Sequence, residues 1–142
     1  ASKLPQITTF TQVGMRDFSS NEIQLTSQTP ERYHQFLDSD IHTQLYHGKA
    51  WSDICRSIIA TLPQHLYISL DIDGLSPFYC PNTGTPVPGG LDFNQIMYLL
   101  DCIDYSGKKI IGFDLVEVCD DDSHWGPNVA SRLLYSLCSL II

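Results

Sequence analysis

Positively charged residues are scarce in this chain of 142 residues, which holds 8 Lys and Arg against 16 Asp and Glu. The formal net charge is −8, and the few basic residues do not cluster. A nucleic-acid partner needs lysine and arginine to neutralise its phosphates, so we expect no DNA or RNA to bind. The acidity is compatible with a cationic small-molecule substrate.

Long apolar runs and closely spaced cysteines are also missing. No stretch reaches the roughly 18 consecutive apolar residues of a membrane span, and no signal-peptide pattern opens the sequence, so we expect neither. Five cysteines at these spacings suit neither zinc pairs nor a disulfide framework. Cys55, Cys102 and Cys138 fall on apolar faces of expected helices, where we expect them to be buried. Unpaired thiols favour a reducing compartment, and we expect the cytoplasm.

Strand-like and helix-like patterns alternate along the chain. Runs of apolar and β-branched residues predict three strands, at residues 7–13, 66–72 and 109–118. Apolar residues at helical spacing predict three long helices, over residues 49–62, 92–107 and 128–141. Asp92 with Gln95 forms a capping-box pattern, and Asn128 is the expected N-cap of the last helix. Between residues 15 and 47 we expect only a short helix, over residues 31–37. The alternation predicts an α/β fold with a mainly parallel sheet.

Two neighbouring acids come where the second predicted strand ends. Residues two apart share a face of a strand, so Asp71 and Asp73 are expected to project together while Ile72 packs into the core. Adjacent carboxylates repel each other unless a cation neutralises them, and such ligands suit magnesium, calcium or manganese. The alternative is that one Asp caps a turn at Gly74 and the other is solvated. Ligand sites of parallel sheets lie outside the carboxyl ends of the strands, which directs attention to the loops after Val13, Ile72 and Val118.

A third acid, Glu117, is expected near the end of the last strand, on the same face as Phe113 and Leu115. A carboxylate there needs a cationic partner, and a guanidinium matches its geometry. That guanidinium belongs either to a substrate or to a structural arginine such as Arg16 or Arg132.

The segment from residue 74 to residue 90 contains four prolines and four glycines. Prolines fix the path of a backbone, and glycines let it pass close to a ligand. Ordered loops of this length inside a domain are usually functional.

Several of these segments resemble motifs of the ureohydrolase (arginase, agmatinase and formimidoylglutamase) family. They are residues 69–75 (SLDIDGL), 84–91 (GTPVPGGL), 112–118 (GFDLVEV) and 128–138 (NVASRLLYSLC), preceded by residues 12–17 (QVGMRD). The resemblance implies a three-layer α/β/α fold, of which residues 1–142 would be the C-terminal part, with the N-terminal half absent. The opening Ala1 in place of Met fits a chain cut from a longer one.

The same resemblance implies a site with two manganese ions and a role for each acid. Asp71 would bridge both ions, Asp73 would bind one, and Glu117 would bind the guanidinium or amidine group of a small-molecule substrate. The implied reaction is hydrolysis of a C–N bond in a linear amidine. Ser76 stands where the family commonly has Asp, which is expected to alter a contact beside the site. Cys119-Asp120 departs from the arginase pattern and favours an agmatinase or formimidoylglutamase type. The family also suggests a homo-oligomer, a trimer or hexamer.

Part of the expected ligand set is missing. The family has an upstream histidine and an Asp-x-His-x-Asp motif, and neither occurs here. We expect surface or packing roles for the five histidines, which are His34, His42, His47, His65 and His124. Two alternatives therefore stay open. One is a non-catalytic subunit with this fold, and the other is a magnesium-dependent phosphatase of the haloacid dehalogenase type. The phosphatase would use Asp71 and Asp73 with the late acids Asp120, Asp121 and Asp122.

Overall fold

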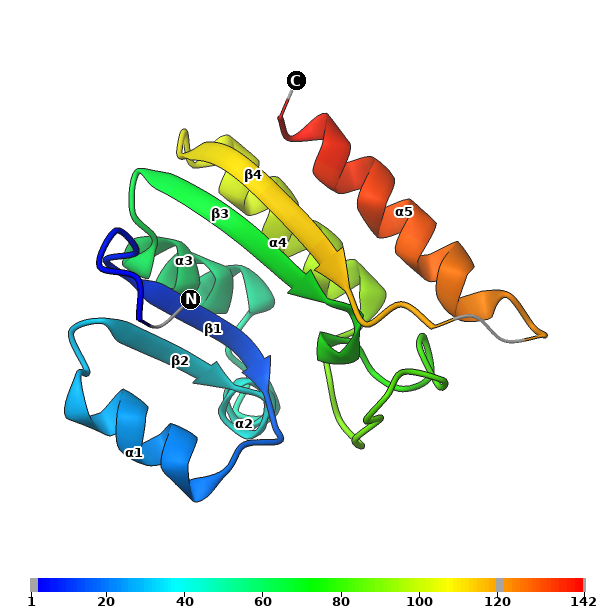
Figure 1. Ribbon diagram of the computed structural model, residues 1–142, viewed down its shortest axis with the longest axis horizontal. Coiled ribbons are helices and arrows are strands. Elements are labelled where there is room, and N and C mark those ends of the chain that lie inside the picture. The colour runs from blue at the N-terminus through cyan, green and yellow to red at the C-terminus, as the bar shows by residue number, and fades with distance from the viewer. Residues whose placement is uncertain (1–2, 120–121, 142) are drawn as a thin grey trace. The chain divides into compact units, whose positions relative to one another are not determined.

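The computed structural model describes residues 3–119 and 122–141, so Asp120 and Asp121 of the phosphatase alternative lie outside the described residues (Figure 1). The chain divides into two compact units, Ala1–Pro63 and Gln64–Ile142. Each unit contains a pair of parallel strands together with helices, as the α/β prediction requires. None of the described helices is both long and apolar enough to cross a lipid bilayer.

The first unit is built on strands β1 (Phe10–Met15) and β2 (Tyr33–Leu37), which pair in parallel. Its helices are α1 (Ser20–Gln28), α2 (Asp38–Tyr46) and α3 (Trp51–Thr61). Strand β1 and helix α3 confirm the predicted strand near residues 7–13 and the predicted helix over residues 49–62. The short helix predicted over residues 31–37 is wrong, because β2 occupies that segment. Its strand conformation comes from pairing with β1, where Tyr33 stacks on Phe10 with ring centroids 5.1 Å apart.

Strands β3 (His65–Asp71) and β4 (Lys109–Val116) form the parallel pair of the second unit. Helices α4 (Phe93–Tyr105) and α5 (Trp125–Ser139) complete the unit, and the short 3₁₀ turn η1 (Ile72–Gly74) follows β3. Buried leucines and isoleucines of β3 and of both helices make the core, among them Leu66, Leu70, Leu100, Ile103, Leu133 and Leu137. The predictions of both strands and of α4 are confirmed. The capping box of Asp92 and Gln95 is present.

The start of α5 differs from the prediction. The helix begins at Trp125, and its N-cap is His124, whose φ is +53°. Asn128 is therefore not the N-cap but a first-turn residue, and its side chain accepts a hydrogen bond from Arg132 Nε at 3.1 Å. The prediction placed the cap too late because Trp125, Gly126 and Pro127 are already part of the helix. Gly126 is buried, and its backbone lies close to the carbonyl oxygen of Cys119.

The cysteines are free thiols with different surroundings. Cys55 is fully buried, which confirms its prediction, while Cys102 is half-buried. Cys138 is exposed, so its predicted burial is wrong. The buried stripe of α5 passes through Val129, Leu133 and Leu137, and Cys138 lies beside this stripe rather than on it.

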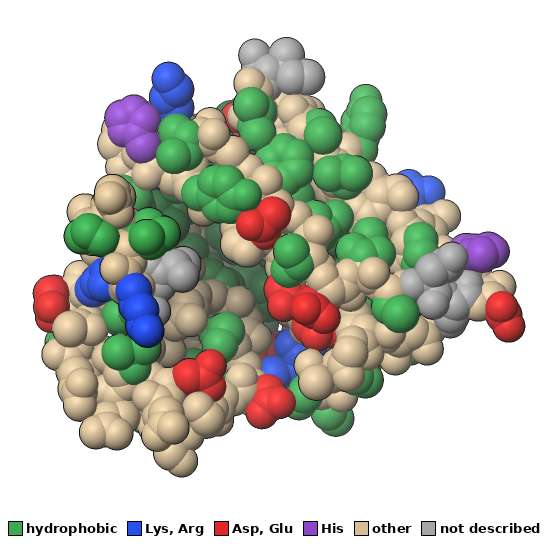
Figure 2. Space-filling model, viewed as in Figure 1, with side chains coloured by type: hydrophobic (Ala, Val, Ile, Leu, Met, Phe, Trp, Pro, Cys, Tyr) green, Lys and Arg blue, Asp and Glu red, His purple; other side chains and the backbone are tan. Residues whose placement is uncertain are grey.

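The two faces of the β3–β4 pair differ. One face carries Leu66 and Leu70 and is buried, whereas the opposite face exposes Tyr67 at 56%. Ile111 and Val116 of β4 are also exposed, at 62% and 39%. Figure 2 shows hydrophobic side chains gathered over these strands on the side turned toward the viewer. Parallel strands are usually covered on both faces, so this face has the character of a surface that packs against further protein.

Candidate functional site

The predicted site acids come together at one edge of the β3–β4 sheet. Asp71, the last residue of β3, pairs with Val116, the last residue of β4. Glu117 therefore follows directly after the residue opposite Asp71. In parallel strands the carboxyl ends share an edge, and here that edge carries Asp71, Asp73 and Glu117.

Asp71 and Asp73 are related by a turn and not by strand periodicity. Strand β3 stops at Asp71, and the next three residues form η1. One side-chain oxygen of Asp71, Oδ1, accepts a hydrogen bond from the backbone N–H of Asp73 at 2.9 Å. The prediction of a continuing strand is thus wrong, although Ile72 is buried as expected, at 1% exposure. The turn, and not a shared strand face, therefore relates the two carboxylates.

Asp73 has one carboxylate oxygen that lacks a hydrogen-bond donor. Its Oδ2 accepts a hydrogen bond from Thr85 Oγ1 at 3.4 Å. Its Oδ1 is buried and has no hydrogen-bond partner among the described residues. A buried carboxylate oxygen without a donor is costly, because its lost hydration is not replaced. Among the described residues, no contact offsets this cost.

The loop between η1 and α4 is tied down at several points. Its base is closed by two backbone hydrogen bonds, from Ser76 to Leu91 and from Leu91 to Gly74, both 3.0 Å. Cys80 is buried, and its Sγ donates to the carbonyl of Ile72 at 3.2 Å. These contacts keep the loop folded over the turn that carries Asp73.

Side chains from the two helices hold the outer part of the same loop. Tyr79 donates from its hydroxyl to Asp92 Oδ2, at the start of α4, at 2.7 Å. Trp125 Nε1, at the start of α5, donates to the carbonyl of Phe78 at 3.1 Å. Both helices of the unit therefore fix the loop, which gives physical support to the functional role expected from its prolines and glycines.

Gly84 and Thr85 connect the acids across this loop. A Cβ atom built on Gly84 would lie 3.6 Å from Glu117 Oε2, so the glutamate side chain passes close to the backbone there. The next residue, Thr85, donates to Asp73. Neighbouring loop residues thus contact Glu117 and Asp73. Sequence reasoning singled out the loop but missed the contact of Thr85, because only the folded loop shows which strand end it meets.

Glu117 is exposed and has an unusual backbone. Its φ is +59°, a conformation that costs a residue with a Cβ roughly 1 kcal/mol or more. Among the described residues of its own unit it forms no ion pair with Arg132, whose Nε donates to Asn128 instead. Arg16, the other structural partner considered, belongs to the first unit. Glu117 thus combines a strained backbone with a carboxylate that forms no ion pair among the described residues of its unit.

The histidines add no ligands at this edge. His34, His42 and His47 belong to the first unit, and His42 bonds to Asp38 through Nδ1. His65 lies at the start of β3, the end of the strand opposite to Asp71. His124 caps α5 and is exposed. Over residues 3–119 and 122–141, no group of three or more His, Cys, Asp or Glu side chains is placed to hold a metal ion.

Comparison with known proteins decides the family. The model of the arginase family matches residues 1–139. The chain belongs to the arginase family. An N(1)-aminopropylagmatine ureohydrolase of Thermus thermophilus is 36% identical over 83 residues, which are 58% of this chain and 28% of that protein. An agmatinase of Pyrococcus horikoshii is 32% identical over 108 residues, which are 76% of this chain and 34% of that protein. The chain spans about a third of these curated relatives or less.

The fold is that of the same family. The arginase of Bacillus caldovelox superposes with a TM-score of 0.76 at 23% identity, over 89% of this chain and 42% of that one. This likeness confirms the predicted arginase-like α/β architecture for the part of the fold that the chain contains. The family assignment also speaks against the haloacid dehalogenase alternative, whose acids would belong to an unrelated fold.

The two aspartates fit a divalent metal ion as part of a ligand set. Both offer hard carboxylate oxygens, which suit manganese or magnesium, and the Oδ1 of Asp73 is buried without a donor. Two carboxylates do not complete the coordination of one such ion, still less of two. The arrangement can therefore hold a metal only together with ligands beyond the described residues.

Proposed function

We propose that this chain is the C-terminal part of a manganese-dependent hydrolase that cleaves a C–N bond in linear amidines. The observation that carries the proposal is the buried, donor-free Oδ1 of Asp73 beside Asp71, at the sheet edge where Glu117 follows β4. Membership of the arginase family and the relatives named for agmatine-type substrates support this reading. Cys119-Asp120 after Glu117 favours an agmatinase or formimidoylglutamase type over an arginase proper.

Each acid has a task in this proposal. Asp71 would serve both manganese ions and Asp73 would serve one of them, through the oxygen that has no donor among the described residues. The hydrogen bonds from Asp73 N–H to Asp71 and from Thr85 to Asp73 keep the ligating oxygens in place before the metal binds. Bound manganese ions act as Lewis acids that make water nucleophilic at neutral pH.

Glu117 recognises the cationic end of the substrate. Its carboxylate matches a guanidinium or amidinium group in a bidentate geometry. Glu117 lies close to the backbone of Gly84, so this loop would help to position the carboxylate for the cation. The residue orients the amidine carbon toward the metal-binding acids and does not itself transfer a proton.

The remaining ligands are proposed to come from protein outside this sequence. The exposed hydrophobic face of the β3–β4 pair, with Tyr67, Ile111 and Val116, supports this, because it is a surface suited to further packing. The free thiols support a cytoplasmic location. Family membership supports a homo-oligomer, proposed as a trimer or hexamer.

The test uses the protein expressed from its complete reading frame, stripped of metal and reloaded with manganese. Product release from agmatine and other guanidino or formimino compounds is measured together with the manganese content. Asp73→Asn should reduce activity by about 1,000-fold or more, equivalent to about 4 kcal/mol, and should lower the bound manganese.

Asp122→Asn is the matched control, because it removes the same charge from an exposed acid beyond β4. It should leave activity unchanged, whereas a phosphatase of the haloacid dehalogenase type would need this acid and would release phosphate with magnesium. Full activity of the Asp73 variant would refute the ligand assignment. A wild-type protein that binds almost no manganese would instead be the non-catalytic subunit.

A further inference from the structure

A polar cluster crosses the β3–β4 pair just before the site edge, and the proposed reaction does not use it. Asp114 of β4 lies opposite Ser69 of β3, and its Oδ1 accepts a hydrogen bond from Ser69 Oγ at 2.7 Å. The hydroxyl of Tyr67 donates a second hydrogen bond to the Asp114 carboxylate. Partial burial, this hydrogen bond and the charge of Asp114 raise the pKa of Tyr67 above its ordinary value of 10.0. One carboxylate of β4 thus binds two hydroxyl groups of β3.

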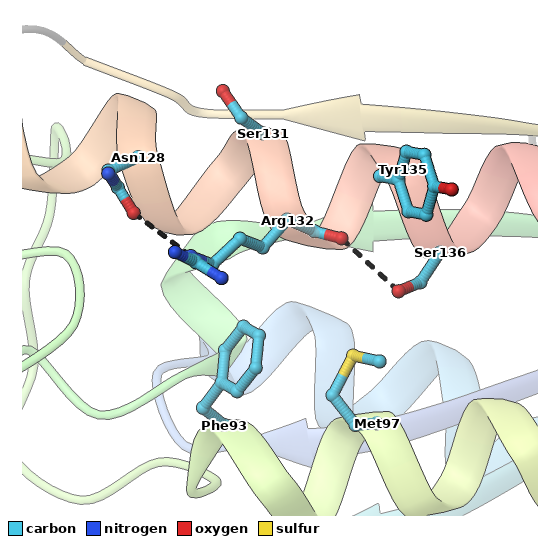
Figure 3. Close-up of a pocket in the computed structure, with 7 residues that line it drawn as sticks. All are labelled: Phe93, Met97, Asn128, Ser131, Arg132, Tyr135 and Ser136. Carbon is cyan, nitrogen blue, oxygen red and sulfur yellow. Dashed lines mark hydrogen bonds between the residues drawn. The ribbon is translucent and has the colours of Figure 1, made fainter.

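The partners of Asp114 among the described residues are hydroxyl groups and not cations. The ion pairs within the described part of the chain lie in the first unit. In the second unit, Arg132 turns its Nε to the side chain of Asn128 instead (Figure 3). Asp114 is half-buried, so the two hydroxyl groups replace part of the hydration that its carboxylate loses. Hydrogen bonds to a carboxylate are stronger than those between neutral groups, which makes this cluster a firm link between the strands.

Strand β4 contains one extra residue relative to β3. Leu66 lies opposite Ile110, whereas the next residue, Tyr67, lies opposite Gly112. A Cβ atom added to Gly112 would lie 3.0 Å from the Tyr67 ring, so the ring rests where this glycine has no side chain. An extra residue in one strand redirects the side chains that follow it, and such irregularities are frequent next to active sites.

The extra residue decides which acids share the sheet edge. In the observed register Asp71 lies opposite Val116, so Glu117 follows directly after its partner. Without the extra residue, Asp71 would lie opposite Leu115, and Glu117 would move one residue farther from it. A shift of one residue turns the side chains of a strand to the opposite face. The two hydroxyl contacts of Asp114 therefore favour the register that brings the site acids together.

We propose that Asp114 is a positioning residue, which keeps the metal-binding Asp71 in register with Glu117. It acts through Ser69, two residues before Asp71 on the same strand, and through Tyr67. The inference rests on the proposed function, because that function assigns Asp71 to the metal. Replacing a residue that holds a metal ligand in place typically weakens metal binding by about 10- to 100-fold. The contacts lie within the chain, so they do not depend on what covers this face of the sheet.

The experiment measures the manganese affinity of the full-length protein, stripped of metal and titrated with manganese alone while the unbound ion is detected. Ser69→Ala removes a donor and should weaken the affinity by about 10-fold. Asp114→Asn should have a similar effect, because one of the two carboxylate acceptors is lost. Ser69→Thr keeps the hydroxyl and should bind manganese nearly as well as the wild type. Asp101→Asn, which removes the same charge from an exposed acid of α4, is the matched control and should not change the affinity.

Wild-type affinity in Ser69→Ala or in Asp114→Asn would overturn this inference alone, since Asp73→Asn tests the ligand assignment separately. So would an affinity of Ser69→Thr as weak as that of Ser69→Ala, or an equal loss in the Asp101 control, because packing or net charge would then be the cause. A wild-type protein that binds almost no manganese would refute the proposed function as well. Thermal unfolding shows that each variant is folded during the titration, and Ser69→Ala keeps the inference testable if Asp114→Asn does not fold.

Discussion

The two segments that leave the β3–β4 sheet at its carboxyl edge are held in different ways. After β3, the backbone turns at once through η1. The loop that follows is held by the backbone hydrogen bond from Ser76 to Leu91 and by hydrogen bonds of the Tyr79 and Cys80 side chains. After β4, Glu117 adopts a left-handed conformation, and its carboxylate is exposed beside Gly84.

This difference matches the two tasks proposed for the acids. Metal ligands work best when their oxygens are fixed before the ion arrives, and Asp73 is fixed by Thr85 and by its own turn. A residue that binds the substrate has to release it after each reaction, and Glu117 makes few contacts that would hold it. The edge thus combines an anchored corner, proposed to bind metal, with a strained residue, proposed to recognise the substrate.

Within the anchored segment, the largest loss of stability is expected from a substitution at Gly90. This residue has φ +94°, and a Cβ added to it would lie 2.5 Å from the backbone carbon and oxygen of Leu75. We expect Gly90→Ala to lower the free energy of unfolding by about 3 kcal/mol or more, because backbone atoms cannot move aside cheaply. Denaturant unfolding measures the change, and the bridge between Leu75 and Leu91 should open.

Gly107 is the matched control for this prediction. It also has a positive φ, +73°, but a Cβ there would meet nothing within 4 Å. Gly107→Ala should cost only about 1 kcal/mol, from the left-handed conformation itself. Equal losses at Gly90 and Gly107 would mean that the loop is not closed as tightly as the structure has it.

Replacing Glu117 in the strained segment should raise stability and lower activity at the same time. Asparagine tolerates the left-handed region better than glutamate, so Glu117→Asn should raise the free energy of unfolding by up to about 1 kcal/mol. The same change should lower kcat/KM by about 100-fold, or about 3 kcal/mol, because the substrate cation loses its carboxylate. Unfolding curves and steady-state kinetics measure the two effects separately.

Glu117→Gln separates strain from charge. It keeps the shape and conformational preference of glutamate, so it should lose activity without any gain in stability. If the asparagine and glutamine variants are equally stable, the backbone of Glu117 is not strained in solution. If both keep full activity, the carboxylate does not bind the substrate.

Local patterns predicted the strands of the second unit and helix α4, but not where α5 begins. The apolar run of β3 and the capping box of α4 act over a few residues, and both are present where the sequence indicates them. In the first unit, β2 reads as Tyr-His-Gln-Phe-Leu and becomes a strand only by pairing with β1. Helix α1 begins at a capping box of Ser19 and Glu22, but the helix is short and polar and lacks a clear apolar stripe, so the sequence predicts no helix there.

For the candidate site, the sequence predicted which residues share the sheet edge but not how they are held. That Asp71 and Glu117 end neighbouring parallel strands follows from the alternation of strands and helices. The turn after Asp71, the contact of Thr85 with Asp73 and the positive φ of Glu117 depend on how the loop packs. Contacts between residues far apart in the sequence produce no periodic pattern, so they cannot be predicted from it.

The smallest expected effect on stability concerns the hydrogen bond between Tyr79 and Asp92, which holds the outer part of the anchored loop. The hydrogen bond from Tyr79 to the carboxylate of Asp92, followed by partial burial, raises the pKa of Tyr79 above its ordinary value of 10.0. A raised pKa in the folded state means that this contribution to stability is complete below pH 10 and is lost as the pH rises through the folded-state value. Tyr79→Phe should therefore cost about 1 kcal/mol at pH 7, and the difference from wild type should shrink in alkali.

The control for this tie is Tyr105→Phe, which removes a hydroxyl from a side chain that is 88% exposed at the end of α4. Denaturant unfolding at neutral and alkaline pH compares the two variants. If Tyr79→Phe is as stable as Tyr105→Phe at pH 7, the tie adds nothing to the loop. Because Asp92 also accepts a hydrogen bond from Asn94 N–H as the N-cap of α4, any loss at Tyr79 should be confined to the loop and leave the helix intact. Unchanged manganese content in the Tyr79 variant would then show that the inner contacts, at Cys80 and Gly90, hold the metal-binding corner.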